Sequence, residues 1–263
     1  MLKKIGITGG NGLIGKILIK ILRKKKIKYT CYRNDIRNLE QLNKWIKSNR
    51  DIDTIYHLAA IVPTNLVENN KKKSISVNFN GTMNIFNTLI SANKNFWFFF
   101  ASTSHVYKPQ KKLLVENDIL KPSSFYGQTK LMSEKFLLDN KNKNIKVCIG
   151  RIFSVFHKYQ KKPFFYPVMK LKFKNRLNNK KNFILKGGNS IRDFSNAEDI
   201  ANIIFKLSKK RATGIINIGS GKKITLLEFI KKYINRYVQI KPTGKSNTIA
   251  ANISKLKKLL ILK

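Results

Sequence analysis

The stretch Thr8–Gly15, which reads TGGNGLIG, is the part of the sequence that decides the fold. A short β-type run at Lys3–Thr8 leads into it, and apolar residues recur at helical spacing from Leu13 to Leu22 behind it. Glycines between a strand and a helix let the backbone approach a pyrophosphate, whose charge the amides and dipole of the helix stabilise. The stretch therefore predicts a dinucleotide-binding turn. The alternative is a tight turn that only packs the helix on the strand.

Outward from this turn, strand-like and helix-like segments alternate to about residue 150. Further strands are predicted at 27–32, 54–60, 96–100 and 145–150, and helices at 39–47, 75–92 and 125–139. This rhythm predicts right-handed crossovers and an α/β fold with a doubly wound parallel sheet, in which ligands bind at the carboxyl ends of the strands.

The second half is less regular and predicts a second, smaller unit. We expect residues 1–150 to form a dinucleotide-binding Rossmann domain, to which residues 189–212 return. Residues 151–188 and 213–263 are expected to form a smaller C-terminal substrate lobe. A strand is predicted at Gly214–Gly219 within that lobe.

The chain is strongly basic, with 54 Lys and Arg against 13 Asp and Glu in 263 residues, a formal net charge of +41. The lysines form short runs along the whole chain, beside many Asn and Ile residues. These three amino acids share A/T-rich codons, so codon bias explains the charge better than selection for nucleic acid. We therefore do not expect specific nucleic-acid binding, although the field should attract anionic ligands such as nucleotides.

The sequence also bears on membrane association, cellular location and metal binding. No apolar run approaches the roughly 20 residues of a membrane helix, so no membrane association is expected. Strand-like sequence begins at Lys3 and only Cys31 and Cys148 are present, which favours a reduced, cytoplasmic protein. The cysteines and histidines are not clustered, so no metal site is predicted.

The end of the second predicted strand bears on the choice of cofactor. Arg33 lies at that point, followed by Asp35, Ile36 and Arg37. An acidic side chain there would hold a ribose 2′-hydroxyl, as in NAD, whereas a basic one would accept the 2′-phosphate of NADP. The arginines favour NADP slightly over NAD. Solvated charges without a cofactor role remain the alternative.

Tyr126 and Lys130 open a predicted helix and lie one turn apart, with about 6 Å of axial rise between them. An ammonium that close can depress the pKa of a tyrosine and let it act as acid or base. Ala101–His105 follows the strand at 96–100 and places hydroxyl groups at the same sheet edge. A hydroxyl there could bind the reacting oxygen while Tyr126 moves its proton.

At this point the chain resembles the extended short-chain dehydrogenase/reductase family, in its NAD(P)-dependent nucleotide-sugar epimerase/dehydratase group. The motifs that carry the resemblance run nearly end to end: TGGNGLIG at 8–15, HLAA at 57–60, VNFNGT at 77–82, STSHVY at 102–107, YGQTK at 126–130, RDF at 192–194 and NIGSG at 217–221.

The resemblance implies roles for individual residues. Tyr126 would be the catalytic acid/base, Lys130 would bind the nicotinamide ribose, and Thr103 would bind the sugar oxygen. Arg192 would contact the diphosphate of the substrate, and the expected substrate-binding residues are Thr103, Ser104, Tyr126 and Arg192. The expected cofactor-binding residues are Gly9, Asn11, Gly12, Leu13, Ile14, Gly15, Arg33, Asp35, Ile36, Leu58, Ala59, Ala60 and Lys130.

Departures from the family pattern narrow the expected reaction. Relatives that act as 4,6-dehydratases typically carry an acidic or hydroxyl residue followed by an acidic one where this chain has Ser104 and His105, so dehydration is disfavoured, although His105 could act as a base. The sequence predicts an oxidoreductase or epimerase acting at C4 of a nucleotide-linked sugar in polysaccharide biosynthesis. A nucleotide-sugar 4,6-dehydratase, or a non-catalytic nucleotide- or RNA-binding protein, are the alternatives.

Three further expectations concern packing. A homodimer is expected by analogy with the family, through an apolar stripe on two helices, with intramolecular core as the alternative. His57 is expected to be a packed core residue, and Asn78 to tether backbone near the cofactor. The stripe consists of Met83, Phe86, Leu89, Leu131, Met132 and Phe136.

Overall fold

A parallel sheet of six strands forms the centre of the computed structural model, which describes residues 2–173 and 183–261. The strand order is β10-β5-β4-β3-β1-β2, and all neighbours are parallel. This confirms the predicted doubly wound α/β class. The strands are β1 (Lys4–Thr8), β2 (Tyr29–Tyr32), β3 (Ile52–His57), β4 (Phe96–Thr103), β5 (Ile145–Ile152) and β10 (Gly214–Ile218).

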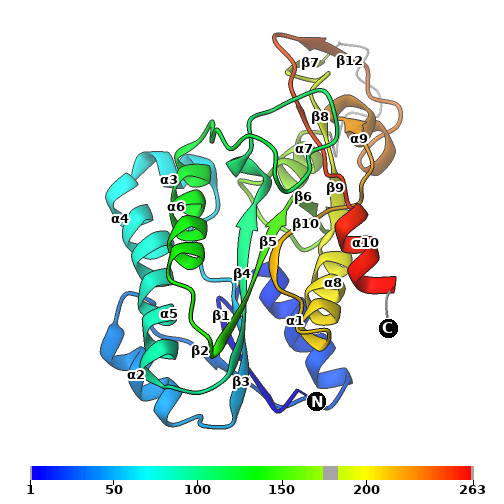
Figure 1. Cartoon of the computed structure of the whole chain (residues 1–263). Helices are drawn as coiled ribbons and strands as arrows, with labels where there is room; N and C mark the ends of the chain where they lie inside the picture. The colour runs from blue at the N-terminus through cyan, green and yellow to red at the C-terminus, as the bar shows by residue number, and fades with distance from the viewer. Residues whose placement is uncertain (1, 174–182, 262–263) are drawn as a thin grey trace.

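Helices cover both faces of this sheet (Figure 1). One apolar cluster joins the sheet to α1 (Leu13–Lys24), α8 (Ala197–Lys209) and α10 (Ser254–Ile261). A second cluster joins the other face to α2 (Leu39–Lys47), α5 (Gly81–Ser91) and α6 (Phe125–Asp139). Strand β4 is buried between the two clusters, which explains its run of aromatic residues.

The chain order reverses at β1, which lies between β2 and β3. Such a reversal opens a crevice at the carboxyl ends of the strands, because the flanking crossovers leave on opposite faces. The glycine turn follows β1 at this point, and the segment after β3 lies beside it, since the amide of Leu58 bonds to the carbonyl of Thr8. The sheet therefore places the predicted turn at its ligand-binding edge.

The predicted helix at 75–92 is interrupted by a π-helical turn. Helices α3 (Thr64–Asn69) and α4 (Lys71–Ile75) precede η1 (Ser76–Asn80), in which the amide of Gly81 bonds to the carbonyl of Ser76, five residues back. A π turn inserts one extra residue into a helix and is frequent at functional sites. Asn78 lies in this turn and is fully buried.

The remaining described segments lie beyond the carboxyl edge of the sheet (Figure 1). They include a short 3-10 turn, two helices and several short strands, although part of the irregular stretch at 151–188 lies outside the described residues. These elements are η2 (Ser104–Val106), α7 (Phe165–Phe173), α9 (Leu226–Tyr233), β6 (Ser154–Phe156), β7 (Phe183–Lys186), β8 (Ile191–Arg192), β9 (Phe194–Asn196), β11 (Ile224–Thr225), β12 (Ile240–Thr243) and β13 (Thr248–Ile249).

Two details differ from the sequence-based division of the chain. The strand β10, which was assigned to the smaller lobe, pairs with β5 in the main sheet. Helix α10 also packs against β10 and α8 rather than against the lobe alone. Both segments return to the sheet because their apolar residues complete its outer edge.

In the expected dimer stripe, Phe86 and Leu89 are fully buried in the core, whereas Met132 is 38% exposed.

Candidate active site

The glycine turn is shaped by steric contacts that leave no room for side chains. Gly9 has φ +74, and a Cβ atom on it would lie 2.6 Å from the amide nitrogen of Ala59. A Cβ on Gly15 would lie 2.5 Å from the carbonyl oxygen of Gly9. Helix α1 starts directly after Gly12, without a side-chain cap or an acidic residue in its first turn. Its first amides therefore remain available to an anion.

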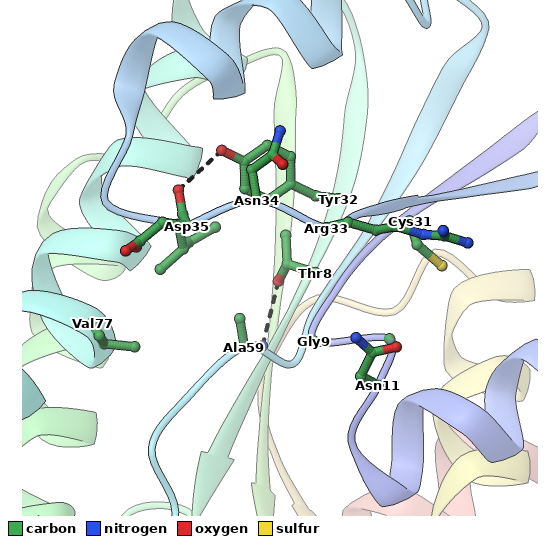
Figure 2. A pocket seen from close by; sticks show the side chains of 12 residues that line it. Thr8, Gly9, Asn11, Cys31, Tyr32, Arg33, Asn34, Asp35, Ala59 and Val77 are labelled. Carbon is green, nitrogen blue, oxygen red and sulfur yellow. Dashed lines mark hydrogen bonds between the residues drawn. The ribbon is translucent and has the colours of Figure 1, made fainter.

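A cavity of about 230 Å³ lies beside this turn (Figure 2). It is a fitting place for the adenosine and pyrophosphate of a dinucleotide, because Gly9 and Gly10 bring backbone without side chains to its wall, beside the uncapped start of α1. The predicted cofactor residues that line it are Gly9, Asn11, Arg33, Asp35, Ile36 and Ala59. Six further residues line the cavity but were not predicted to bind the cofactor, namely Thr8, Gly10, Cys31, Tyr32, Asn34 and Val77.

Some predicted cofactor residues lie outside the lining of this cavity. Gly12, Leu13 and Ile14 form the start of α1, and Gly15 packs against the turn. Leu58 and Ala60 flank the lining residue Ala59. Most of the lining residues that were missed are chain neighbours of predicted ones. Val77 is different, because only the tertiary fold brings η1 to this place.

Asp35 forms an ion pair with a neighbouring side chain, whereas Arg33 does not within the described residues. Arg37 binds the Asp35 carboxylate through its Nε at 2.9 Å and its Nη2 at 2.5 Å, and these bonds lower the pKa of Asp35 to about 2. Arg33 lies beside Cys31 (Figure 2) and makes no hydrogen bond or ion pair within the described part of the chain. The cavity therefore has one uncommitted cation at the end of β2.

Tyr126 and Thr103 meet at the carboxyl edge of β4. Ser124 caps α6 by accepting the amide of Gly127 at 3.2 Å, which places Tyr126 in the first turn, 8% exposed. Burial raises the pKa of Tyr126, and the nearby Thr103 side chain acts against this rise, so the depressed pKa expected from Lys130 is not found. The phenol is therefore protonated at neutral pH, and its hydroxyl lies against a second hydroxyl.

Lys130 lies one turn further along α6 and is almost completely buried. Burial lowers its pKa to about 7, while the Glu134 carboxylate opposes this shift. Its Nζ atom lies 4.0 Å from the centroid of the Phe100 ring. A lysine that can gain or lose its proton near neutrality is thus placed beside the tyrosine.

Glu134 belongs to a buried network of charged and polar side chains that was not predicted from the sequence. It forms a two-pronged ion pair with Arg151 at 2.7–3.1 Å, and both side chains are 1% exposed. Ser102 donates to the same carboxylate. The spacing of Glu134 from Lys130 on a helix was the available signal, but nothing in the sequence identified Arg151 as its partner.

The remaining predicted substrate residues lie near Tyr126. The ring of His105 meets the ring of Tyr126 edge-on at 5.8 Å, and Ser104 is buried beside it. Burial and the positive charge of Arg192 lower the pKa of His105, so this imidazole is neutral. Arg192 is held by the backbone carbonyls of Ile191 and Asn247 at 2.8 and 3.1 Å. The structure thus brings the predicted substrate residues to one place.

This geometry agrees with comparisons to known proteins. The family model described as NAD dependent epimerase/dehydratase family matches residues 5–219. The chain belongs to this family. A curated relative, the GDP-6-deoxy-D-talose 4-dehydrogenase of Aggregatibacter actinomycetemcomitans, is 32% identical and covers 83% of this chain and 74% of its own length.

Solved structures show the same fold with either nicotinamide cofactor. RMD from Pseudomonas aeruginosa, complexed with NADPH, has a TM-score of 0.85 at 18% identity and covers 98% of this chain and 92% of its own. The UDP-glucose 4-epimerase of Thermus thermophilus, complexed with NAD, has a TM-score of 0.80 at 19% identity, with 97% and 92% covered. At these identities the likenesses show the fold alone, and NADPH and NAD are the cofactors of those two proteins.

The described residues contain neither a cluster of metal ligands nor a membrane-spanning helix. Across residues 2–173 and 183–261, no three His, Cys, Asp or Glu side chains gather closely enough to hold a metal ion. Over the same residues, no helix is sufficiently long and apolar to pass through a bilayer.

The glycine turn gives a first testable prediction. Gly9→Ala should lower the free energy of unfolding by more than the about 1–2 kcal/mol of a left-handed backbone alone, because its Cβ also meets the backbone of Ala59. NADH and NADPH binding, measured by isothermal titration, should be lost as well. Gly214→Ala is the matched control, since Gly214 has φ +81 but its Cβ would meet only the Lys255 Nζ atom, at an ordinary contact distance of 3.9 Å. Equal destabilisation of the two variants would contradict the steric argument.

Proposed function

We propose that this protein is an NAD(P)-dependent oxidoreductase or epimerase that acts at C4 of a nucleotide-linked sugar. The observation that carries the proposal is the convergence of the Thr103 and Tyr126 side chains with the buried Lys130, at the edge of the sheet where the glycine turn lies. The family supports a nucleotide-sugar substrate, and one relative is by name a 4-dehydrogenase of a GDP-linked 6-deoxy sugar.

Each of the three residues has a chemical part in this proposal. A bound nicotinamide cofactor supplies or accepts the hydride at C4. Tyr126 gives its proton to the C4 oxygen in reduction and takes it back in oxidation, and its protonated state suits the first of these steps. Thr103 binds the same oxygen and orients it. In its protonated form, Lys130 places a positive charge one helical turn from the phenol and stabilises the phenolate.

The groups around this site favour transfer at C4 over loss of water. A 4,6-dehydratase needs a base for the proton at C5, and the two residues after Thr103 are Ser104, a hydroxyl, and His105, whose lowered pKa makes its imidazole a weaker base. Arg192 lies near His105 and can bind the diphosphate of the substrate. Epimerisation uses the same residues as reduction, with oxidation followed by reduction on the other face of the sugar.

The experiment begins with mass spectrometry of ligands that copurify with the protein. It continues with NADPH consumption on a panel of 4-keto nucleotide sugars, with wild-type protein and Tyr126→Phe side by side. Consumption by the wild type alone supports a reductase, and tightly retained NAD⁺ with interconversion of 4-epimers supports an epimerase. A protein that binds RNA with steep salt dependence and turns over no nucleotide sugar contradicts the proposal.

We further propose that the cofactor is NADP, since Arg33 is the uncommitted cation of the cavity and Asp35 is bound to Arg37. Arg33→Ala is expected to weaken NADPH binding about 10- to 100-fold, the range for hydrogen bonds to charged groups, and to leave NADH binding nearly unchanged. Titration calorimetry with both cofactors measures this. Lys20→Ala, an exposed change on α1, controls for the loss of one positive charge. An equal loss of affinity for both cofactors would refute a contact with the 2′-phosphate.

A further inference from the structure

His57 is the last residue of β3 and is 1% exposed, yet both of its ring nitrogens have hydrogen-bond partners. Its Nδ1 lies 2.7 Å from the Thr8 hydroxyl at the end of β1, and its Nε2 lies 2.9 Å from the Thr82 hydroxyl on α5. The ring packs between Phe98 and Phe100, each at 5.8 Å between ring centroids. The imidazole is therefore fixed in position on both its polar and its apolar sides.

The partner on α5 decides which nitrogen carries the proton. The Thr82 hydroxyl donates to the backbone carbonyl of Asn78 at 2.7 Å. A hydroxyl has one hydrogen, so Thr82 can only accept from His57. The Nε2 atom of His57 must therefore be protonated, and in the neutral ring Nδ1 is an acceptor.

On the other side of the ring, the Nδ1 atom of His57 accepts a hydrogen bond. Thr8 donates its hydroxyl hydrogen to Nδ1 of His57, and its oxygen lies 3.4 Å from the amide nitrogen of Ala59, which can donate to it. Burial, with the charge of Lys130 adding to it, lowers the pKa of His57 to about 3. A neutral imidazole fits this arrangement, because a charged ring would have two donors. Thr8 and Ala59 both line the cavity of Figure 2.

The hydrogen bonds continue from Thr82 to the helix that carries Tyr126. The side-chain amide of Asn78 binds the backbone N–H and C=O of Ile61, as a backbone tether should, and also donates to Thr129 at 3.2 Å. Thr129 donates to the backbone carbonyl of Tyr126 at 2.9 Å. A series of buried groups thus links the wall of the cofactor cavity to the first turn of α6.

We propose that His57 is a positioning residue, in its neutral Nε2–H form, that couples the cofactor cavity to the catalytic helix. Its Nδ1 holds Thr8 and, through Thr8, the segment at Ala59. Its Nε2–H holds Thr82 and, through Asn78 and Thr129, the turn that carries Tyr126. The effects on turnover and on cofactor binding rest on the proposed function, whereas the tautomer does not.

The first test reads the tautomer in the wild-type protein. Two-dimensional NMR correlating ring protons with ring nitrogens, on protein labelled with ¹⁵N-histidine, should show a neutral Nε2–H ring for His57. Its shifts should stay constant between about pH 5 and 8, where a free histidine titrates. His57→Phe identifies the signal by its loss, and His105 and His157 are internal comparisons. An Nδ1–H ring, or a His57 signal that titrates in this range, overturns the proposal.

The second test distinguishes the role of the Nδ1 atom of His57 from that of its Nε2 atom. His57→Asn carries an amide near the position of Nδ1 and can still bind Thr8, whereas His57→Gln reaches toward the position of Nε2 and Thr82. We expect His57→Gln to weaken NADPH and NADH binding about 10-fold, since it leaves the Thr8 hydroxyl without its acceptor. His57→Asn should keep cofactor affinity and lower kcat by a similar factor.

Isosteric variants of the two threonines complete the design. Thr8→Val removes the hydroxyl on the cavity side, so combined with His57→Gln it should add little further loss of cofactor affinity. Thr82→Val combined with His57→Asn should likewise add little further loss of kcat. Equal losses of affinity and kcat in both His57 variants would show a merely structural role and refute the coupling. A wild-type protein that binds no cofactor would instead refute the proposed function, and the NMR result would still judge the tautomer.

Discussion

Replacement of Tyr126 by phenylalanine is expected to lower kcat by about 10²- to 10⁴-fold, the range for loss of a general acid or base. Phenylalanine keeps the ring that packs edge-on against His105 and removes only the hydroxyl that meets Thr103. Cofactor affinity and the free energy of unfolding should change little, because the phenol does not line the cofactor cavity. Steady-state kinetics on the identified sugar, titration calorimetry and urea denaturation measure the three quantities.

Tyr107→Phe is a matched control for this experiment. Tyr107 is another buried tyrosine, 1% exposed, whose hydroxyl donates to the Asn217 side chain at 2.7 Å. Its loss should lower the free energy of unfolding by about 0.5–1.5 kcal/mol and leave the proton transfer intact. If Tyr126→Phe retained more than a tenth of the wild-type kcat, or if Tyr107→Phe lost as much, the role of the phenol would be disproved.

The largest effect on stability is expected for Arg151→Met. The change leaves the carboxylate of Glu134 buried without its guanidinium, and breaking such a pair from one side costs about 3–5 kcal/mol. Arg151 also donates to the backbone carbonyl of Glu116 at 2.8 Å and lies over the Tyr107 ring at 4.7 Å, so it joins three segments. Urea denaturation followed by circular dichroism measures the loss.

Two further variants test whether the ion pair is the cause. Glu134→Leu combined with Arg151→Met removes both charges of the pair and should be less destabilised than Arg151→Met alone, because the carboxylate is no longer buried without its guanidinium. Lys44→Ala breaks the exposed pair with Glu40 on α2 and should have little effect. A double variant at least as unstable as Arg151→Met would assign the loss to packing rather than to charge.

Local patterns in the sequence determined the fold class and the outline of the site. The glycine turn and the alternation of strands and helices depend on residues within a few positions of one another, so they can be read without knowing the fold. The same holds for Tyr126 and Lys130, whose separation of one helical turn follows from their spacing. Both groups lie at the carboxyl edge of the sheet, as the parallel arrangement required.

Only the tertiary structure decided which distant residues meet. The sequence marked His57 as a core residue, but its partners Thr8 and Thr82 lie 49 and 25 positions away. The pairing of Glu134 with Arg151 and the return of β10 to the main sheet likewise join segments that are not neighbours in the chain. A periodic pattern shows which face of an element is buried, whereas the three-dimensional packing of the whole chain sets what that face meets. That is why the parts of the site followed from the sequence, and the hydrogen bonds that connect them did not.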